Sequence, residues 1–79
     1  CKDLPAEDEV ERTMQQHNDT IQQIGQVAPG FVGVEIDSFR CEGKADIVIW
    51  YGTHEQRLAI EKIIGSNAFF GIPYRLQNR

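Results

Sequence analysis

The second half of the chain alternates between strand-like and helix-like patterns of hydrophobic residues. Residues 45–51 form an apolar run. Thr53 and Gln56 then have the spacing of a capping box, in which each side chain caps the backbone of the other at a helix start. The helix should end at Gly65, and residues 69–76 form a second extended run. This order predicts a β-α-β unit with a right-handed crossover and two parallel strands.

The first half of the chain predicts one long helix over residues 5–24. Its apolar stripe recurs at steps of four and three residues and comprises Val10, Met14, His17, Ile21 and Ile24. Pro29 and Gly30 end any continuation. His17 interrupts the stripe, and we expect it to be a core histidine with one satisfied ring nitrogen. If buried, it would be a pH-sensitive packing element.

Between the two helices, residues 31–40 alternate as a strand. The short turn at residues 41–44, with Gly43 free to take positive φ, should join it to residues 45–51 as an antiparallel hairpin. The strand at 45–51 is apolar on both faces and should be central. Pro73 lacks a ladder donor, which favours an edge position for the last strand.

These elements predict an α+β fold in the order α-β-β-α-β, as a single domain over residues 1–79 with a flexible N-terminus at 1–4. We expect a two-layer sandwich in which both helices cover one face of a three-stranded sheet. This is a ferredoxin-like fold without its first strand. In the full fold, the first strand lies between the last strand and the second strand of the hairpin. Without it, either the second and third strands pair directly or a strand from a partner fills the position. Direct pairing is favoured because a vacancy exposes two rows of unpaired backbone groups.

The net charge of −4 lies in the first part of the chain. Residues 1–20 hold six acidic and two basic side chains, a difference of −4, and the remainder balances at six and six. Without a basic patch, nucleic acid and anionic membrane surfaces are disfavoured as partners. No apolar stretch reaches the length of about 20 residues that spans a bilayer.

The sheet face opposite the helices should carry one large aromatic side chain among glycines and charged residues. We predict that face as the interaction surface, formed by Trp50, Phe39, Val48, Pro73 and Arg75. Trp50 either merely covers the neighbouring glycines or forms the centre of a contact with another protein or a second copy of the chain.

Three carboxylates also belong to that face, those of Glu35, Asp37 and Asp46. Paired carboxylates can act as acid and base or hold a hard cation, but an open sheet excludes no water and shifts no pKa. We expect them to be solvated strand carboxylates near Arg75. The sequence therefore predicts no catalytic residue, no metal site, no cofactor and no enzyme. His17, Cys41 and His54 lack the spacing of metal ligands.

Cys1 has two alternative roles. Mature bacterial lipoproteins begin with a lipid-bearing cysteine, which fits the first residue here; the other reading is a cysteine left by another cleavage. A Cys1–Cys41 disulfide would require an oxidising compartment. One sulfur cannot carry both a lipid and a disulfide.

Three short motifs carry a family resemblance. They are Pro29-Gly30-Phe31-Val32-Gly33-Val34, then Ile47-Val48-Ile49-Trp50-Tyr51, then Gly71-Ile72-Pro73-Tyr74-Arg75. Over residues 28–76 the chain resembles small α+β domains of exported bacterial proteins, sometimes found beside trypsin-like peptidases. The resemblance implies a non-enzymatic domain that is secreted, periplasmic, at the cell surface or lipid-anchored. The predicted function is protein–protein contact through the open sheet face. The alternative is a prodomain-like or inhibitory module acting on a peptidase.

Overall fold

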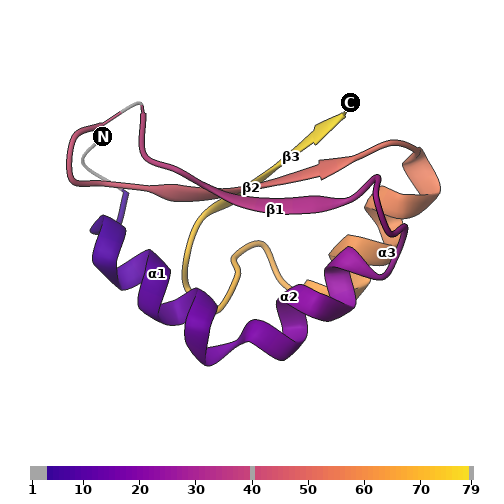
Figure 1. The fold of residues 1–79 in the computed structure, drawn as a ribbon, viewed down its shortest axis with the longest axis horizontal. Coiled ribbons are helices and arrows are strands. Elements are labelled where there is room, and N and C mark those ends of the chain that lie inside the picture. Colours follow the sequence, from indigo (N-terminus) through magenta and orange to yellow (C-terminus); the bar gives the residue numbers. More distant parts are fainter. Residues whose placement is uncertain (1–3, 40, 79) are drawn as a thin grey trace.

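The chain folds into two helices, two strands, a further helix and a last strand, which confirms the α+β class (Figure 1). The computed structural model describes residues 4–39 and 41–78. The elements are α1 (Glu7–Gln16), α2 (Asn18–Gly25), β1 (Gly33–Asp37), β2 (Asp46–Tyr51), α3 (His54–Ile64) and β3 (Tyr74–Asn78).

The three strands form one sheet in the order β1-β2-β3. β1 pairs with β2 antiparallel, with Val34 opposite Ile49. β2 pairs directly with β3 in parallel, with Ile49 opposite Leu76. Direct pairing of the second and third strands was the favoured prediction, and the register confirms it. β2 is central, as its apolar residues on both faces indicated.

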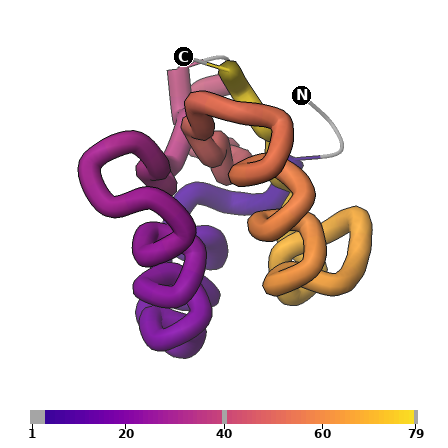
Figure 2. Tube along the Cα trace, turned by 90° about the vertical axis from the view of Figure 1, so that its right-hand side faces the viewer, coloured from indigo at the N-terminus to yellow at the C-terminus, as the bar shows by residue number. Residues whose placement is uncertain are grey.

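The helices cover one face of this sheet and leave the other face uncovered by any helix (Figure 1). Seen from the side, the α1–α2 segment and α3 lie beneath the sheet as two neighbouring columns (Figure 2). The core between the layers includes fully buried side chains from both, namely Val10, Ile24, Ile47, Ile49, Ile60 and Phe69. Tyr74 packs against this core, and burial, followed by the nearby Glu61 carboxylate, raises the pKa of its hydroxyl.

The capping residues of α3 lie where the sequence placed them. The backbone N–H of Gln56 donates to Thr53 Oγ1 at 3.2 Å, and the N–H of Thr53 donates to Gln56 Oε1 at 3.2 Å. Gly65 ends the helix with φ of 74°, a left-handed conformation that glycine adopts without strain. Local chemistry alone therefore determined both ends of this helix.

The predicted long helix is wrong, because the chain breaks at His17 into α1 and α2. His17 has φ of −120° and ψ of 34°, which is not helical. A straight helix over residues 5–24 would be about 30 Å long, whereas strands of five residues span about 17 Å. The break lets Val10 and Ile24 reach the same core. The His17 ring is half-buried and stacks on Phe70 at 3.4 Å between centroids.

The predicted start of the last strand is also wrong. The chain reverses between Phe69 and Ile72, whose backbones exchange hydrogen bonds of 2.8 and 2.9 Å. Phe70 and Gly71 occupy the turn with φ of 51° and 89°. Strict alternation over residues 69–76 would direct Phe70 toward the helices and Phe69 to the open face. The reversal breaks that alternation, so Phe69 is buried and Phe70 is 53% exposed. β1 is likewise shorter than the predicted strand at residues 31–40.

Candidate functional site

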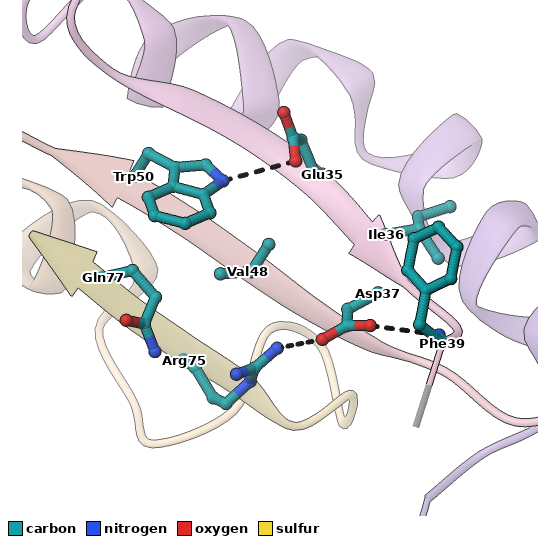
Figure 3. A pocket seen from close by; sticks show the side chains of 8 residues that line it. All are labelled: Glu35, Ile36, Asp37, Phe39, Val48, Trp50, Arg75 and Gln77. Atoms are coloured by element: carbon teal, nitrogen blue, oxygen red, sulfur yellow. Dashed lines mark hydrogen bonds and ion pairs between the residues drawn. The ribbon is translucent and has the colours of Figure 1, made fainter. Parts of the chain in front are cut away.

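The sheet face without helices carries a shallow hollow of about 390 Å³ (Figure 3). All three strands contribute to its walls, and the lining residues are Glu35, Ile36, Asp37, Phe39, Val48, Trp50, Arg75 and Gln77. Four predicted members of the interaction surface are therefore together here: Trp50, Phe39, Val48 and Arg75. The fifth, Pro73, does not line the hollow. It precedes β3, and its carbonyl accepts a hydrogen bond of 3.1 Å from the N–H of Ile47.

Trp50 and Glu35 form one end of the hollow (Figure 3). Gly33 lies directly opposite Trp50 in the register, and Glu35 is the next residue of β1 on the same face. The indole Nε1–H donates to Glu35 Oε2 at 3.3 Å. The indole is half-buried and the Glu35 side chain is exposed. Among the described residues, Glu35 accepts this hydrogen bond from a neutral group and makes no ion pair.

Arg75 binds two carboxylates on the same face. Asp37 and Asp46 lie opposite each other on β1 and β2. The Arg75 guanidinium, from β3, donates through Nε to Asp46 Oδ2 at 2.9 Å and through a terminal nitrogen to Asp37 Oδ2. Pairing of this kind offsets the loss of hydration that a buried carboxylate suffers. The three residues therefore join all three strands of the sheet on its open side.

The prediction of solvated carboxylates is wrong for Asp46. Asp46 is only 1% exposed, whereas a carboxylate on an uncovered sheet face was expected to face water. Its neighbours explain the difference, because Asp37 lies opposite it on β1 and the Arg75 guanidinium of β3 donates to its Oδ2 at 2.9 Å. Asp37 and Asp46 are thus engaged by a guanidinium, and Glu35 is the exposed carboxylate of the hollow.

Two apolar side chains form the remaining surfaces of the hollow. Val48 lies at its centre and is 5% exposed (Figure 3). Phe39 follows the end of β1 and is 96% exposed, while its backbone N–H donates to Asp37 Oδ1 at 3.1 Å. A phenyl ring so fully in water costs free energy that contact with another apolar surface would recover. Phe39 is therefore the side chain of this face most open to a partner.

Two lining residues were predicted neither as part of the interaction surface nor among the carboxylates of that face. Gln77 lies two residues after Arg75 on β3, and the alternation of a strand places both on one face. That signal was present in the sequence. Ile36 alternates with Glu35 and Asp37, so the strand pattern directs it toward the helices, yet on the edge strand β1 it also lines the hollow. Its contribution depends on the sheet order and carried no sequence signal.

Other candidate chemistry lies apart from the hollow. Within residues 4–39 and 41–78, no three His, Cys, Asp or Glu side chains are grouped to hold a metal ion. No helix among these residues has the length and hydrophobicity to cross a bilayer. His54 is exposed at the start of α3. Cys41 is buried and disulfide-bonded, and Cys1, the predicted lipid-attachment residue, lies outside the described residues.

Comparison with known proteins adds no relative. No family model, no curated protein and no solved structure matches the chain. The resemblance to exported bacterial domains stays a prediction, and the functional argument rests on the open sheet face.

Proposed function

We propose that this protein is a non-catalytic binding domain that contacts another protein through its open sheet face. The observation that carries the proposal is the placement of Trp50, Phe39 and Arg75 around one hollow on the face that no helix covers. Trp, Tyr and Arg dominate the residues that contribute most to protein interfaces. The hollow is open and shallow, so it does not resemble a reaction site from which water is excluded.

Site-specific photo-cross-linking tests this contact. Benzoylphenylalanine replaces Phe39 on the open face or, as the control, Leu58 on α3, which is 51% exposed. Both positions already hold large exposed hydrophobic residues, so neither change disturbs the core. In cells that produce the protein, we expect one defined cross-linked product from position 39 and none of that mass from position 58.

The variant Trp50→Ala makes the test specific for the face. Removal of the indole should leave the far-ultraviolet circular dichroism spectrum unchanged and reduce the yield of the cross-linked product about tenfold, the loss typical of a central interface residue. Equal products from both positions, or an unchanged yield in Trp50→Ala, would contradict a contact through this face.

A second candidate function follows from the edge position of β3. An edge strand exposes a row of backbone groups that can pair with an extended segment, as in many peptidase–inhibitor contacts. The alternative proposal is a prodomain-like or inhibitory module, with residues 76–79 directed toward the protease; Arg79 lies outside the described residues. The test is the activity of a broad panel of secreted serine proteases with the domain added at micromolar concentration. If the domain slows none of them, this alternative is wrong.

Two further proposals concern the setting of the domain. The order of strands and helices is compatible with a ferredoxin-like sandwich that lacks its first strand. The motif resemblance favours an exported bacterial protein that is periplasmic, at the cell surface or anchored by lipid on Cys1, and a lipid on that sulfur would exclude the Cys1–Cys41 disulfide. The mass of the mature chain separates the two states of Cys1, because an acylated sulfur adds lipid mass and a Cys1–Cys41 disulfide removes two hydrogens.

A further inference from the structure

We propose that the outer edge of β1 receives an extended segment of the partner protein, which adds a further strand to the sheet. This inference rests on the proposed function, because the edge borders the hollow at Ile36 and Phe39, and it names the part of the partner that docks there. It follows from the directions of the backbone groups of β1, from the exposed rings at both ends of the strand, and from the small area of the open face.

The backbone of β1 offers hydrogen-bonding groups on the side away from β2. The N–H of Ile47 donates to the carbonyl of Pro73 at 3.1 Å, so Ile47 directs its backbone groups toward β3. Ile36 lies opposite Ile47 in the antiparallel register, and the two residues therefore form a pair without mutual hydrogen bonds. The N–H and C=O of Ile36 point outward, and those of Val34 do the same two residues earlier. In the part of the chain that the structure describes, no strand or bridge pairs with this side of β1.

β1 lacks three of the features by which edge strands exclude a further strand. Such edges often carry lysine, proline or a bulge. Residues 33–37 contain no lysine and no proline, and they pair with β2 in an uninterrupted register. The other edge strand, β3, follows Pro73 directly. Of the two edges, β1 is therefore the better template for an added strand.

Two exposed phenyl rings lie at the two ends of this edge. Phe31 comes two residues before β1 and Phe39 two residues after it, and they are 64% and 96% exposed. The Phe39 ring lies beside the half-buried Ile36 (Figure 3). A segment that pairs along the whole of β1 reaches both ends of the strand, where its apolar side chains would cover the rings. Partner residues opposite Val34 and Ile36 share the face of those side chains, so apolar residues suit these positions too.

The area of the face and the position of Glu35 indicate another protein and not a second copy of the chain. Strands about 4.8 Å apart that rise about 3.3 Å per residue make a three-stranded, five-residue face of about 240 Å². Stable interfaces bury about 800 Å² on each partner, and main-chain hydrogen bonds along an edge supply affinity that the face alone lacks. If β1 paired with β1 of a second copy in full antiparallel overlap, the two Glu35 carboxylates would lie directly opposite each other. Like charges in that position are destabilising.

Titration with a designed peptide tests the docking. The probe is the blocked peptide acetyl-Ser-Thr-Val-Thr-Val-Thr-Ser-amide, whose two valines can lie opposite Val34 and Ile36. We expect millimolar peptide to shift the amide nuclear magnetic resonance signals of these two residues and to slow exchange of their N–H groups with solvent. Leu76 of β3 is the internal control and should not change. It directs its N–H away from β2, because Pro73, three residues earlier, directs its carbonyl toward β2.

Two methylated peptides show whether backbone hydrogen bonds carry the binding. N-methylation of both valines removes the N–H groups that would donate to the carbonyls of β1. N-methylation of the last two threonines makes the same chemical change on the side of the peptide that faces solvent. We expect the first peptide to bind about tenfold more weakly, the effect of two lost hydrogen bonds. The second should bind like the unmodified peptide.

A matched pair of proline variants locates the site on the protein. Val34→Pro removes an outward N–H of β1, and Leu76→Pro removes an outward N–H of β3. Both side chains pack against the same core, and proline is tolerated at edge positions whose N–H faces solvent. We expect the peptide to lose its binding to Val34→Pro and to keep its binding to Leu76→Pro. If either variant fails to fold, the two methylated peptides still decide the question.

Several outcomes would overturn the proposal. They are unchanged signals of Val34 and Ile36 at millimolar peptide, equal weakening by both methylations, and changes at Leu76 alone. Shifts at β1 that grow with protein concentration in the absence of peptide would overturn it in favour of a second copy. A cross-link from position 39 would still stand in each case, so failure here is distinguishable from failure of the proposed contact.

Discussion

Asp46 is the residue whose environment departs most from the expectation for its type. Carboxylates are almost never fully buried unless they are paired, and Asp46 is 1% exposed. The guanidinium of Arg75 meets it at 2.9 Å and also binds Asp37. Removal of this guanidinium would take hydrogen bonds to a cation away from a buried carboxylate and from the carboxylate opposite it. Arg75 is therefore expected to contribute to stability as well as to lining the hollow.

We predict that Arg75→Met destabilises the protein by about 1–3 kcal/mol, because Met keeps the apolar stem and removes the hydrogen bonds to charged groups. The control is Arg57→Met, since Arg57 pairs with the well-exposed Glu61 on α3. Exposed pairs contribute little to stability, so Arg57→Met should cost less than Arg75→Met. The free energy of unfolding from urea denaturation measures both. An equal loss of unfolding free energy in the two variants would show that the Arg75–Asp46 pair contributes no more to stability than an exposed pair.

The turn between α3 and β3 illustrates how one element can reverse a pattern. Phe70 and Gly71 both have positive φ, which two-residue hairpin turns of type I′ require. Asn-Gly is the usual pair for such a turn, whereas Phe-Gly is not. Phe70 adopts this conformation with its ring stacked on His17, at 3.4 Å and an interplanar angle of 4°. The turn and the helix break therefore support each other through one pair of rings.

We predict opposite effects of alanine at two glycines with equal space around them. A Cβ at Gly71 or at Gly25 meets no atom within 4 Å. Gly71 has φ of 89°, so Gly71→Ala should destabilise by about 1–2 kcal/mol through backbone strain alone. Gly25 ends α2, so Gly25→Ala should be neutral or stabilise by up to about 1 kcal/mol. Thermal unfolding followed by circular dichroism measures the change in stability of each variant. If Gly71→Ala stabilised the protein, backbone strain at this position would be refuted.

At the scale of the whole molecule, the uncovered sheet face is the main functional feature. All helices lie on the opposite side, so the sheet has one face in the core and one face in solvent (Figure 1). An antiparallel or mixed sheet tolerates this arrangement when its open face is polar. Here that face is mostly polar, and the apolar exceptions, Trp50, Phe39 and the buried Val48, are at the hollow. The exposed aromatic area is localised and small.

We expect the protein to be monomeric at micromolar concentration. The open face covers about 240 Å² by the strand spacings, well below the area of about 800 Å² per partner that stable dimers bury. Sedimentation velocity measures the mass directly, and Trp50→Ala serves as the comparison. A dimer that dissociates in Trp50→Ala would identify a second copy of the chain as the partner of this face.

Much of the architecture follows from local sequence patterns. The capping box of Thr53 and Gln56, with Gly65 at the far end, sufficed for α3, because caps satisfy backbone groups within one turn. The alternation in β1 and β2 assigned Trp50 and Val48 to the face away from the helices, since side chains of a strand alternate strictly. Trp50 and Val48 line the hollow for that reason, and alternation in β3 likewise places Arg75 there, whereas Phe39 lies beyond the end of β1.

Only the tertiary structure decided where these local patterns stop. The helix breaks at His17 because the layer must fit a sheet shorter than the apolar stripe. The positions of Phe69 and Phe70 are exchanged because a hairpin turn interrupts the alternation. Asp46 is buried because strands distant in sequence bring Asp37 and Arg75 against it. Each outcome depends on contacts between segments far apart in the chain, which a periodic pattern of neighbours does not encode.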